Sequence, residues 1–247
     1  MVTKIEWTSH TWNPTTGCTK ISPGCQNCYA EIFANRLKMM KIKEYENGFN
    51  FTMHRHKLNQ PLQRKKPTIY FVNSMSDLFH LDVSDFFLDR VFDTILKTPH
   101  HTYQILTKRS ARMMQYFSRR SCPPNAWLGV TVEKASSKER IAHLATIEAP
   151  VRFVSFEPLL EYLGNLNLDG IGWVIVGGES GNRARPMLPQ WVNPIKDQCL
   201  AEDIPFFFKQ WGSWGPDGVK RSKKNNGRIL NGKIYDGMPA VGGRIFL

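Results

Sequence analysis

The chain of 247 residues is 41% hydrophobic and 22% charged, close to the average of a folded domain, which excludes wholesale disorder. No apolar run approaches the roughly 20 residues of a membrane helix, and the first residues show no signal-peptide pattern, so a cytoplasmic protein that does not enter a membrane is expected. Thirty-three Lys and Arg against 21 Asp and Glu give a net charge of +12, which favours a polyanionic partner, nucleic acid first.

Short apolar runs alternate with amphipathic stretches along most of the chain. The runs are rich in β-branched or aromatic residues, and they predict strands near 6–13 and at 69–72, 103–106, 127–132, 151–156, 173–176 and 206–208. The amphipathic stretches predict helices after Tyr29, at 84–98 with Ser84 as N-cap, at 110–118, at 136–148, and within 189–203 with a start at Pro194. Methionines 39–40 and 113–114 are expected in the core.

Repeated strand–helix units predict an α/β fold, a partial or complete parallel (β/α) barrel of six to seven strands. No GxGxxG follows the first strand, which argues against a Rossmann sheet. The barrel domain is expected over 1–211, with a basic, helix-poor insertion at 46–68. Residues 212–247 predict a Gly-rich extension of the same domain that packs on the barrel and contains a hairpin at Asn231-Gly232.

The cysteines are unevenly placed: three of the five fall within eleven residues, at Cys18, Cys25 and Cys28. In a reducing compartment such clustering indicates a metal or redox site rather than a disulfide framework. Gly17, Pro23 and Gly24 predict a tight loop at 17–29 that runs into a helix start, where the helix dipole favours thiolates. Three thiolates leave one metal corner open, as a catalytic iron–sulfur centre requires and a structural zinc site avoids.

A zinc site is the alternative interpretation of the same cysteines. It needs a fourth ligand, for which His10, His54 and His56 are the candidates.

A three-cysteine loop after the first strand of a parallel (β/α) barrel resembles the radical S-adenosylmethionine superfamily. More specifically, the chain resembles a phage- and bacteria-associated three-cysteine-motif family of poorly defined function. The matching stretches are WNPTTGCTKISPGCQNCYA at 12–30, SMSDLF at 74–79, GVTVE at 129–133, SFEPLL at 155–160, GGESG at 177–181, KQWG at 209–212 and LNGKIYD at 230–236. The superfamily loop has three residues between its first two cysteines where this chain has six, and its usual aromatic before the third cysteine is here Asn27.

Polar residues follow almost every predicted strand, and in a parallel barrel chemistry occurs at the carboxyl ends of the strands. The residues expected to contact a cofactor are Ser74, Asp77, Lys108, Arg109, Glu133, Glu157, Gly177, Gly178, Glu179 and Ser180. Ser74 and Asp77 are candidates for the ribose hydroxyls, and Lys108 or Arg109 for a carboxylate. Gly177-Gly178-Glu179 resembles the superfamily's element that holds the methionine amino group, although two glycines after a strand also suit a simple turn.

The resemblance implies an enzyme in which Cys18, Cys25 and Cys28 bind a 4Fe-4S cluster, and the cluster binds S-adenosylmethionine. Such an enzyme generates a 5′-deoxyadenosyl radical and requires an electron donor. The basic surface makes a nucleic acid or a nucleotide-derived molecule the expected substrate, with Trp211 and Trp214 either stacking on bases or anchoring the extension. The alternatives are a zinc-stabilised, non-catalytic nucleic-acid-binding protein and an iron–sulfur regulatory protein. The oligomeric state stays open, with a monomer as one expectation.

Overall fold

The computed structural model describes residues 3 and 5–240. Its main sheet has seven strands in the order β1-β4-β5-β6-β7-β8-β9. The strands of this sheet therefore lie side by side in the order in which they occur along the chain. Strands β1 and β4, β4 and β5, β7 and β8, and β8 and β9 pair in parallel. The α/β class and the seven parallel strands of a partial (β/α) barrel, predicted from the sequence, are therefore confirmed.

The chain forms two compact units. Unit 1 comprises residues up to 129 together with 146–150, and unit 2 comprises 130–145 together with 151 onward. Strand β6 (Ala126–Thr131) spans the boundary, and all six of its residues are buried, as is typical of a strand covered on both faces.

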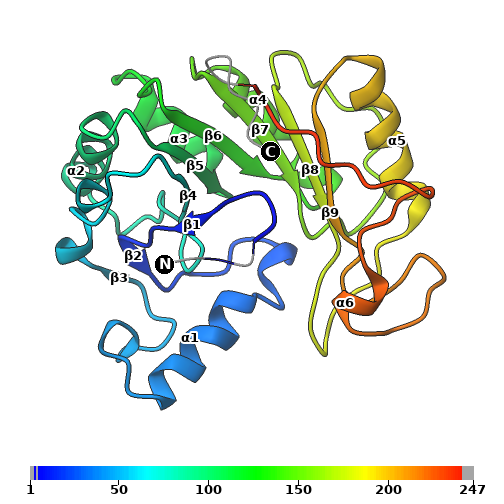
Figure 1. The fold of residues 1–247 in the computed structure, drawn as a ribbon, viewed down its shortest axis with the longest axis horizontal. Helices are drawn as coiled ribbons and strands as arrows, with labels where there is room; N and C mark the ends of the chain where they lie inside the picture. The colour runs from blue at the N-terminus through cyan, green and yellow to red at the C-terminus, as the bar shows by residue number, and fades with distance from the viewer. Residues whose placement is uncertain (1–2, 4, 241–247) are drawn as a thin grey trace. The chain divides into compact units, whose positions relative to one another are not determined.

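Unit 1 contains most of the predicted strand–helix units (Figure 1). In chain order its remaining strands and helices are β1 (His10–Thr11), β2 (Thr15–Thr16), α1 (Tyr29–Met39), β3 (Thr52–Met53), β4 (Ile69–Val72), α2 (Asp85–Leu96), β5 (Thr102–Thr107) and α3 (Ser110–Phe117). Strands β2 and β3 form a small antiparallel pair of their own. The insertion at 46–68 is helix-poor as predicted, with β3 and short 3-10 turns at Arg55–Lys57 and Pro61–Gln63.

Helix α2 begins where the sequence predicts, because the hydroxyl of Ser84 accepts a hydrogen bond from the amide of Phe87 at 3.2 Å. Its buried face includes Phe87, Val91 and Ile95, which recur at helical spacing. Helix α1 is different, since only the small residues Ala30 and Ala34 are buried on it.

The prediction that all four methionines lie in the core is wrong for the first pair. Met39 and Met40 are 78% and 58% exposed, whereas Met113 is fully buried. The helix that carries the first pair packs through its alanines, so its long apolar side chains are left outside.

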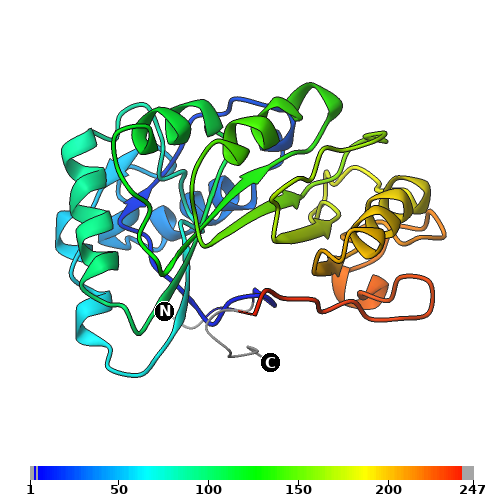
Figure 2. The ribbon, with the colours of Figure 1, turned by 90° about the horizontal axis from the view of Figure 1, so that it is seen from above.

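Unit 2 contains α4 (Glu139–Ala145), β7 (Val151–Phe156), β8 (Trp173–Gly177), α5 (Pro189–Ala201), β9 (Phe206–Gln210) and α6 (Lys223–Asn226). Helix α5 runs beside β9 (Figure 2). The prediction that α5 starts at Pro194 is wrong, because Pro189 occupies the first turn and Pro194 lies inside the helix. Packing of Val192, Ile195 and Cys199 in the core compensates for the backbone hydrogen bond that an internal proline removes.

The described part of the C-terminal extension folds back onto β8 and β9. Asn231 and Gly232 both have positive φ, 51° and 76°, and Leu230 and Lys233 exchange two backbone hydrogen bonds, which confirms the predicted tight hairpin. Beyond it, the amide of Phe208 donates to the carbonyl of Tyr235, and the indole of Trp173 donates to the carbonyl of Gly237. Residues 241–247 of the predicted extension lie outside the described residues.

No helix within residues 5–240 is both long enough and apolar enough to pass through a membrane.

Candidate functional site

The cysteine loop of unit 1 follows β1 and β2, and its first turn is fixed by backbone contacts. The amide of Gly17 donates to the carbonyl of Met75, and the amide of Cys18 donates to the carbonyl of Phe49. Gly17 has a φ of +73°, a conformation that glycine adopts without steric cost. The polypeptide before Cys18 is therefore held between two other segments of unit 1.

The second half of the loop joins the start of α1. A 3-10 turn at Pro23–Cys25 carries the second cysteine, and Cys28 is the N-cap residue of α1. Cys28 also packs against a small cluster of buried residues that contains Ala30, Ala34 and Met75. A helix start carries partial positive charge, which favours an anionic sulfur at this place.

The charged groups around the loop affect the cysteines differently. Burial and the carboxylate of Asp77 raise the pKa of Cys18, although Arg109 acts to lower it. For Cys25, burial acts to raise the pKa, but the charge of Lys108 and hydrogen bonds from Ser22 outweigh burial, so the pKa is lowered. The Cys25 thiolate is thus favoured by its surroundings.

The first two thiols of the loop act on each other, and the second and third act on the same lysine. Cys25 is among the groups that raise the pKa of Cys18, which places these two sulfurs within electrostatic range. The pKa of Lys20 is raised first by its ion pair with Glu31 and further by Cys28 and Cys25. Cationic groups of Lys20, Lys108 and Arg109 therefore accompany the loop.

The donor set fits a metal group that is held by three thiolates. All three cysteines are only partly buried, and the cations beside them offset the negative charge that thiolates carry. As the loop stands, no three His, Cys, Asp or Glu side chains in the described part of the chain lie close enough together to hold a metal.

The histidines considered as a fourth zinc ligand have other surroundings. The ring of His54 forms a 2.8 Å hydrogen bond with Thr16, and burial lowers its pKa to about 4. His10 packs edge-on against the ring of Tyr70, and His56 packs against His54.

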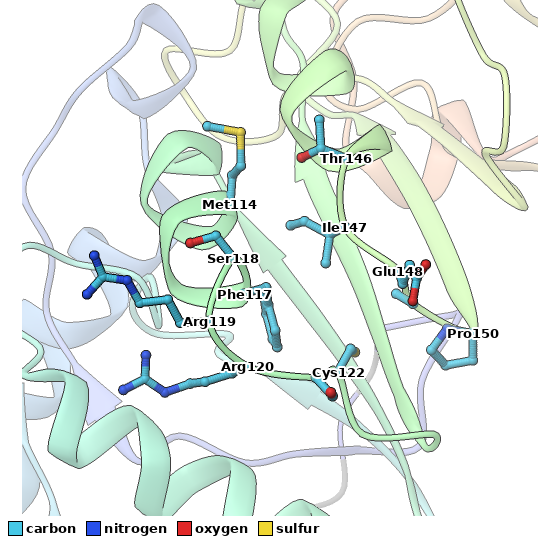
Figure 3. A pocket seen from close by; sticks show the side chains of 12 residues that line it. Met114, Phe117, Ser118, Arg119, Arg120, Cys122, Thr146, Ile147, Glu148 and Pro150 are labelled. Carbon is cyan, nitrogen blue, oxygen red and sulfur yellow. The ribbon is translucent and has the colours of Figure 1, made fainter.

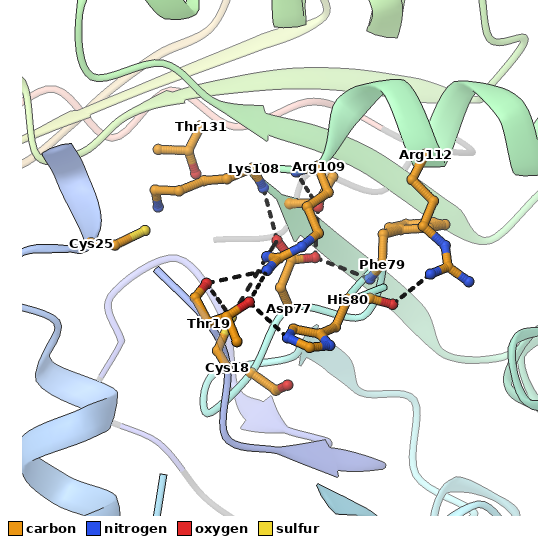
Figure 4. A network of polar contacts seen from close by, with 12 residues as sticks. Cys18, Thr19, Cys25, Asp77, Phe79, His80, Lys108, Arg109, Arg112 and Thr131 are labelled. Atoms are coloured by element: carbon orange, nitrogen blue, oxygen red, sulfur yellow. Dashed lines mark hydrogen bonds and ion pairs between the residues drawn. The ribbon is translucent and has the colours of Figure 1, made fainter. Parts of the chain in front are cut away.

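Asp77 is the centre of a hydrogen-bond network at the ends of β4 and β5 (Figure 4). One carboxylate oxygen accepts from the hydroxyl of Thr107 at 2.6 Å and from the amide of Phe79. The other accepts from the amide of Lys108 at 3.0 Å and from Arg109 at 3.4 Å. Asp77 is 7% exposed and accepts all of these bonds within the protein, while its contact with a ribose stays a prediction.

Ser74, the other predicted ribose contact, is also bonded within the protein. Its hydroxyl lies 3.1–3.2 Å from the side-chain amide of Asn13, and its carbonyl accepts from the hydroxyl of Tyr29.

Lys108 and Arg109, predicted as alternatives for one carboxylate, have separate surroundings. Arg109 is 9% exposed and donates to Cys18, Thr19 and Asp77. Lys108 is half-buried, and its side chain extends toward Cys25 in Figure 4. Of the two, Lys108 is the one whose charge remains available to a ligand beside the loop.

The remaining predicted residues belong to unit 2, and the three glutamates among them are held in ion pairs. Glu133 is fully buried and accepts from Arg140 at 2.8 Å, and one of its oxygens has no hydrogen-bond partner among the described residues. At the ends of β7 and β9, Glu157 accepts from Lys209 with both oxygens, at 2.7 and 2.9 Å. Gly177, at the end of β8, faces Glu157 closely.

Gly178, Glu179 and Ser180 form a turn whose contacts are with the protein itself. A side chain at Gly178 would overlap the carbonyl oxygen of Trp211, so close packing of two backbones explains this glycine. The carboxylate of Glu179 is bonded by the side chain and the amide of Arg185. Gln210 donates to the hydroxyl of Ser180. Close packing of the backbone therefore accounts for a glycine at Gly178 in this turn without a ligand.

Two groups of basic residues are candidates for contacts with phosphates, and the structure pairs some of them within the protein. In the first group, Arg64, Lys65 and Lys66, the side chain of Arg64 donates to Thr68, while the two lysines are exposed. The second group consists of Lys220, Arg221, Lys223 and Lys224. Arg221 pairs with Asp217, and Lys220 donates to the carbonyl of Asn182, while Lys223 and Lys224 are exposed.

The two tryptophans near the second basic group are anchored inside unit 2. The indole of Trp211 donates to the carbonyl of Ile229, and the indole of Trp214 donates to the carbonyl of Ala184. Their rings hold the extension in place, as one of the two interpretations of the sequence expected.

A hollow of about 1010 Å³ lies elsewhere in unit 1, at the carboxyl end of α3 (Figure 3). It is lined from the end of α3 through Cys122 and by residues 146–150. None of the predicted site residues lines it, and burial raises the pKa of Cys122 to about 12, so this thiol is protonated at neutral pH.

Two residues of the cysteine-loop network were missed in the sequence. Thr19 accepts hydrogen bonds from Arg109 and His80, and His80 stacks on Phe51 with ring centroids 4.3 Å apart. The partners are separated by 90 and 61 residues in the chain, and no local pattern signals such pairs.

Comparisons with solved structures find spore photoproduct lyase in several forms. A mutant form bound to AdoMet and dinucleoside spore photoproduct is 10% identical with a TM-score of 0.47 over 69% of this chain and 56% of that one. A second mutant form is 11% identical with a TM-score of 0.49 over 72% and 58%, and a complex with dinucleoside spore photoproduct is 10% identical with a TM-score of 0.45 over 67% and 54%. This chain thus spans little more than half the length of those proteins.

A comparison with curated proteins finds no match. Among protein families, one matches residues 2–239, nearly the whole chain. The chain belongs to that family, DUF5131, a family of proteins of unknown function.

Proposed function

We propose that this protein is a radical S-adenosylmethionine enzyme whose 4Fe-4S cluster is bound by Cys18, Cys25 and Cys28. The observation that carries the proposal is one loop with three partly buried thiols, accompanied by three cationic side chains, in a unit of parallel strands. When bound, the cluster and S-adenosylmethionine together supply reductive cleavage of the cofactor to a 5′-deoxyadenosyl radical.

In this proposal, residues of the chain bind the cluster and orient S-adenosylmethionine. The three thiolates hold the cluster, and their number leaves one iron without a protein ligand. Lys108 lies beside Cys25 and offers an ammonium group to the carboxylate of S-adenosylmethionine. Residues Glu133, Glu157, Gly177, Gly178, Glu179 and Ser180 remain predicted contacts of the cofactor or substrate. The ion pairs of the three glutamates would have to open or be shared for such contacts.

Cleavage of S-adenosylmethionine is the experiment that tests this activity. Anaerobically reconstituted protein is expected to bind S-adenosylmethionine in calorimetry and to release 5′-deoxyadenosine when a strong reductant is added. Lys108→Gln should weaken binding about ten- to a hundredfold, since one charge-assisted hydrogen bond contributes about 1.5–3 kcal/mol. Lys97→Gln, an exposed change at the end of α2, is the matched control. A reconstituted protein that binds no S-adenosylmethionine would refute the proposed activity.

The substrate class follows from charge. A net charge of +12 together with exposed lysine pairs at Lys65–Lys66 and Lys223–Lys224 favours a nucleic acid or a nucleotide-derived substrate. The same charge would also serve a non-catalytic nucleic-acid-binding protein. Metal content distinguishes the two classes, because the latter would contain zinc rather than an iron–sulfur cluster.

Nucleic-acid affinity should fall steeply as salt is raised, because bound lysines displace counterions from phosphates. The double variants Lys65→Gln/Lys66→Gln and Lys223→Gln/Lys224→Gln should each reduce the slope of log affinity against log salt, by about 1 for each lysine that contacts a phosphate. The control Lys97→Gln/Arg119→Gln should leave the slope unchanged. Titration of labelled DNA and RNA at several salt concentrations measures this slope, and absence of binding at low salt would turn the search toward small anionic substrates.

A further inference from the structure

Arg109 lies between β5 and α3 and connects the strand ends of unit 1 to the cysteine loop (Figure 4). One terminal nitrogen, Nη1, donates to the sulfur of Cys18 at 3.6 Å and to Asp77 at 3.4 Å. The other, Nη2, donates to the carbonyl of Thr19 at 3.1 Å and to its hydroxyl at 2.8 Å. Each terminal nitrogen therefore makes two hydrogen bonds, as many as its two hydrogens allow.

Asp77 fixes the direction of the guanidinium. Its carboxylate is bonded by Thr107 and by the amides of Phe79 and Lys108, so it cannot turn without breaking several hydrogen bonds at once. A carboxylate held in this way presents one oxygen to Arg109 and compensates its buried charge.

Thr19 is fixed from the opposite side. The Nδ1 atom of His80 accepts from the amide of Asp82 at 3.2 Å, so the proton of the neutral ring is on Nε2, which donates to the Thr19 hydroxyl at 2.9 Å. Phe51 stacks on the His80 ring with an interplanar angle of 5°. The residue directly after Cys18 is thus bonded by both Arg109 and His80.

We propose that Arg109, oriented by Asp77, is a positioning residue for Cys18 that also tunes the cluster. Its guanidinium fixes the sulfur of the first cysteine and provides that sulfur with one N–H hydrogen bond and a nearby positive charge. Both effects stabilise the more negative, reduced form of a cluster and so raise its reduction potential. The inference rests on the proposed cluster, and it moves Arg109 from the expected carboxylate contact to the support of the loop.

The chain offers a matched control for this role. Arg112 is on the same helix, α3, and donates to the carbonyls of His80, Leu81 and Val83. Arg112 therefore stabilises the segment that carries His80, but it contacts backbone carbonyl groups of that segment and not the cysteine loop. Arg112→Gln should lower stability and leave the cluster's potential unchanged.

The experiment measures iron content and the midpoint potential of the reconstituted protein without S-adenosylmethionine, by a redox titration followed by electron paramagnetic resonance. Arg109→Gln should shift the potential to more negative values, and Arg109→Lys, which keeps the charge, should shift it less.

The outcomes separate the inference from the proposed function. If wild-type protein takes up no cluster, the proposed function fails, and the inference fails with it. If wild-type takes up the cluster while Arg109→Gln has full iron and the wild-type potential, the inference alone is overturned. If Arg109→Gln loses iron, retention of iron by Arg112→Gln supports the inference, and equal loss in Arg112→Gln overturns it because the role would be structural.

Discussion

Alanine at Cys18, Cys25 or Cys28 is expected to abolish binding of the iron–sulfur cluster in each of the three single variants. A cluster held by three thiolates loses a third of its protein ligands with each change, and the two thiolates that remain leave a second iron without a protein ligand. Iron and sulfide analysis after anaerobic reconstitution, together with visible absorbance, measures the loss.

The two other cysteines provide the matched controls. Cys122 is half-buried and Cys199 is buried, and burial raises the pKa of each thiol to about 12, so neither is a thiolate at neutral pH. Cys122→Ala and Cys199→Ala should therefore keep wild-type iron content. Full iron content in Cys18→Ala would show that the six-residue spacing does not bring this cysteine to the metal.

Gly17→Ala is expected to be the most damaging single change in the cysteine loop. An added Cβ would lie 2.5 Å from the carbonyl carbon of Asn50 and 2.6 Å from the carbonyl oxygen of Phe49, and these backbone atoms cannot move as the end of a side chain can. We expect a loss of more than about 3 kcal/mol of unfolding free energy, which lies toward the exceptional end for a single substitution. Urea denaturation of the purified protein measures it.

Gly218→Ala is the control that separates the effect of the steric clash at Gly17 from the effect of its left-handed backbone conformation. Gly218 has a φ of +72°, almost the same as the +73° of Gly17, but no atom lies within 4 Å of an added Cβ. Its substitution should cost only about 1–2 kcal/mol, the penalty of a left-handed residue. Equal destabilisation of the two variants would contradict the close packing around Gly17.

The strands were predictable because each is a short apolar run whose residues are buried together. Val151–Phe156 and Ile69–Val72 begin and end in the structure where the sequence places them. The hairpin at Asn231-Gly232 was predictable for a different reason, since a type I′ turn requires positive φ at both positions and these residues tolerate it. In each case the determining interaction is local or follows directly from burial.

The details of the site depend on contacts that sequence periodicity does not encode. Arg109 lies 91 residues from Cys18, and only the folding of β4 and β5 brings the two together. The adjacent residues Lys108 and Arg109 have the same charge in the sequence, yet one is half-buried beside Cys25 and the other is nearly fully buried in the network.

The sequence also did not reveal which residues pair with the buried carboxylates. Glu179 was expected to meet a ligand's ammonium group, but Arg185, six residues later, already bonds its carboxylate. A charged residue directly after a buried strand needs a partner, because an unpaired buried charge is costly. Side chains of the protein itself meet that need at Glu157 and Glu179, and at Glu133 they meet it for one of the two oxygens.

Metal analysis of the wild-type protein isolated without oxygen distinguishes an iron–sulfur cluster from a zinc site. We expect a brown protein with about four irons and matching sulfide per chain, as a 4Fe-4S cluster requires. A colourless protein with one tightly bound zinc would contradict it and would support a zinc-stabilised binding protein instead.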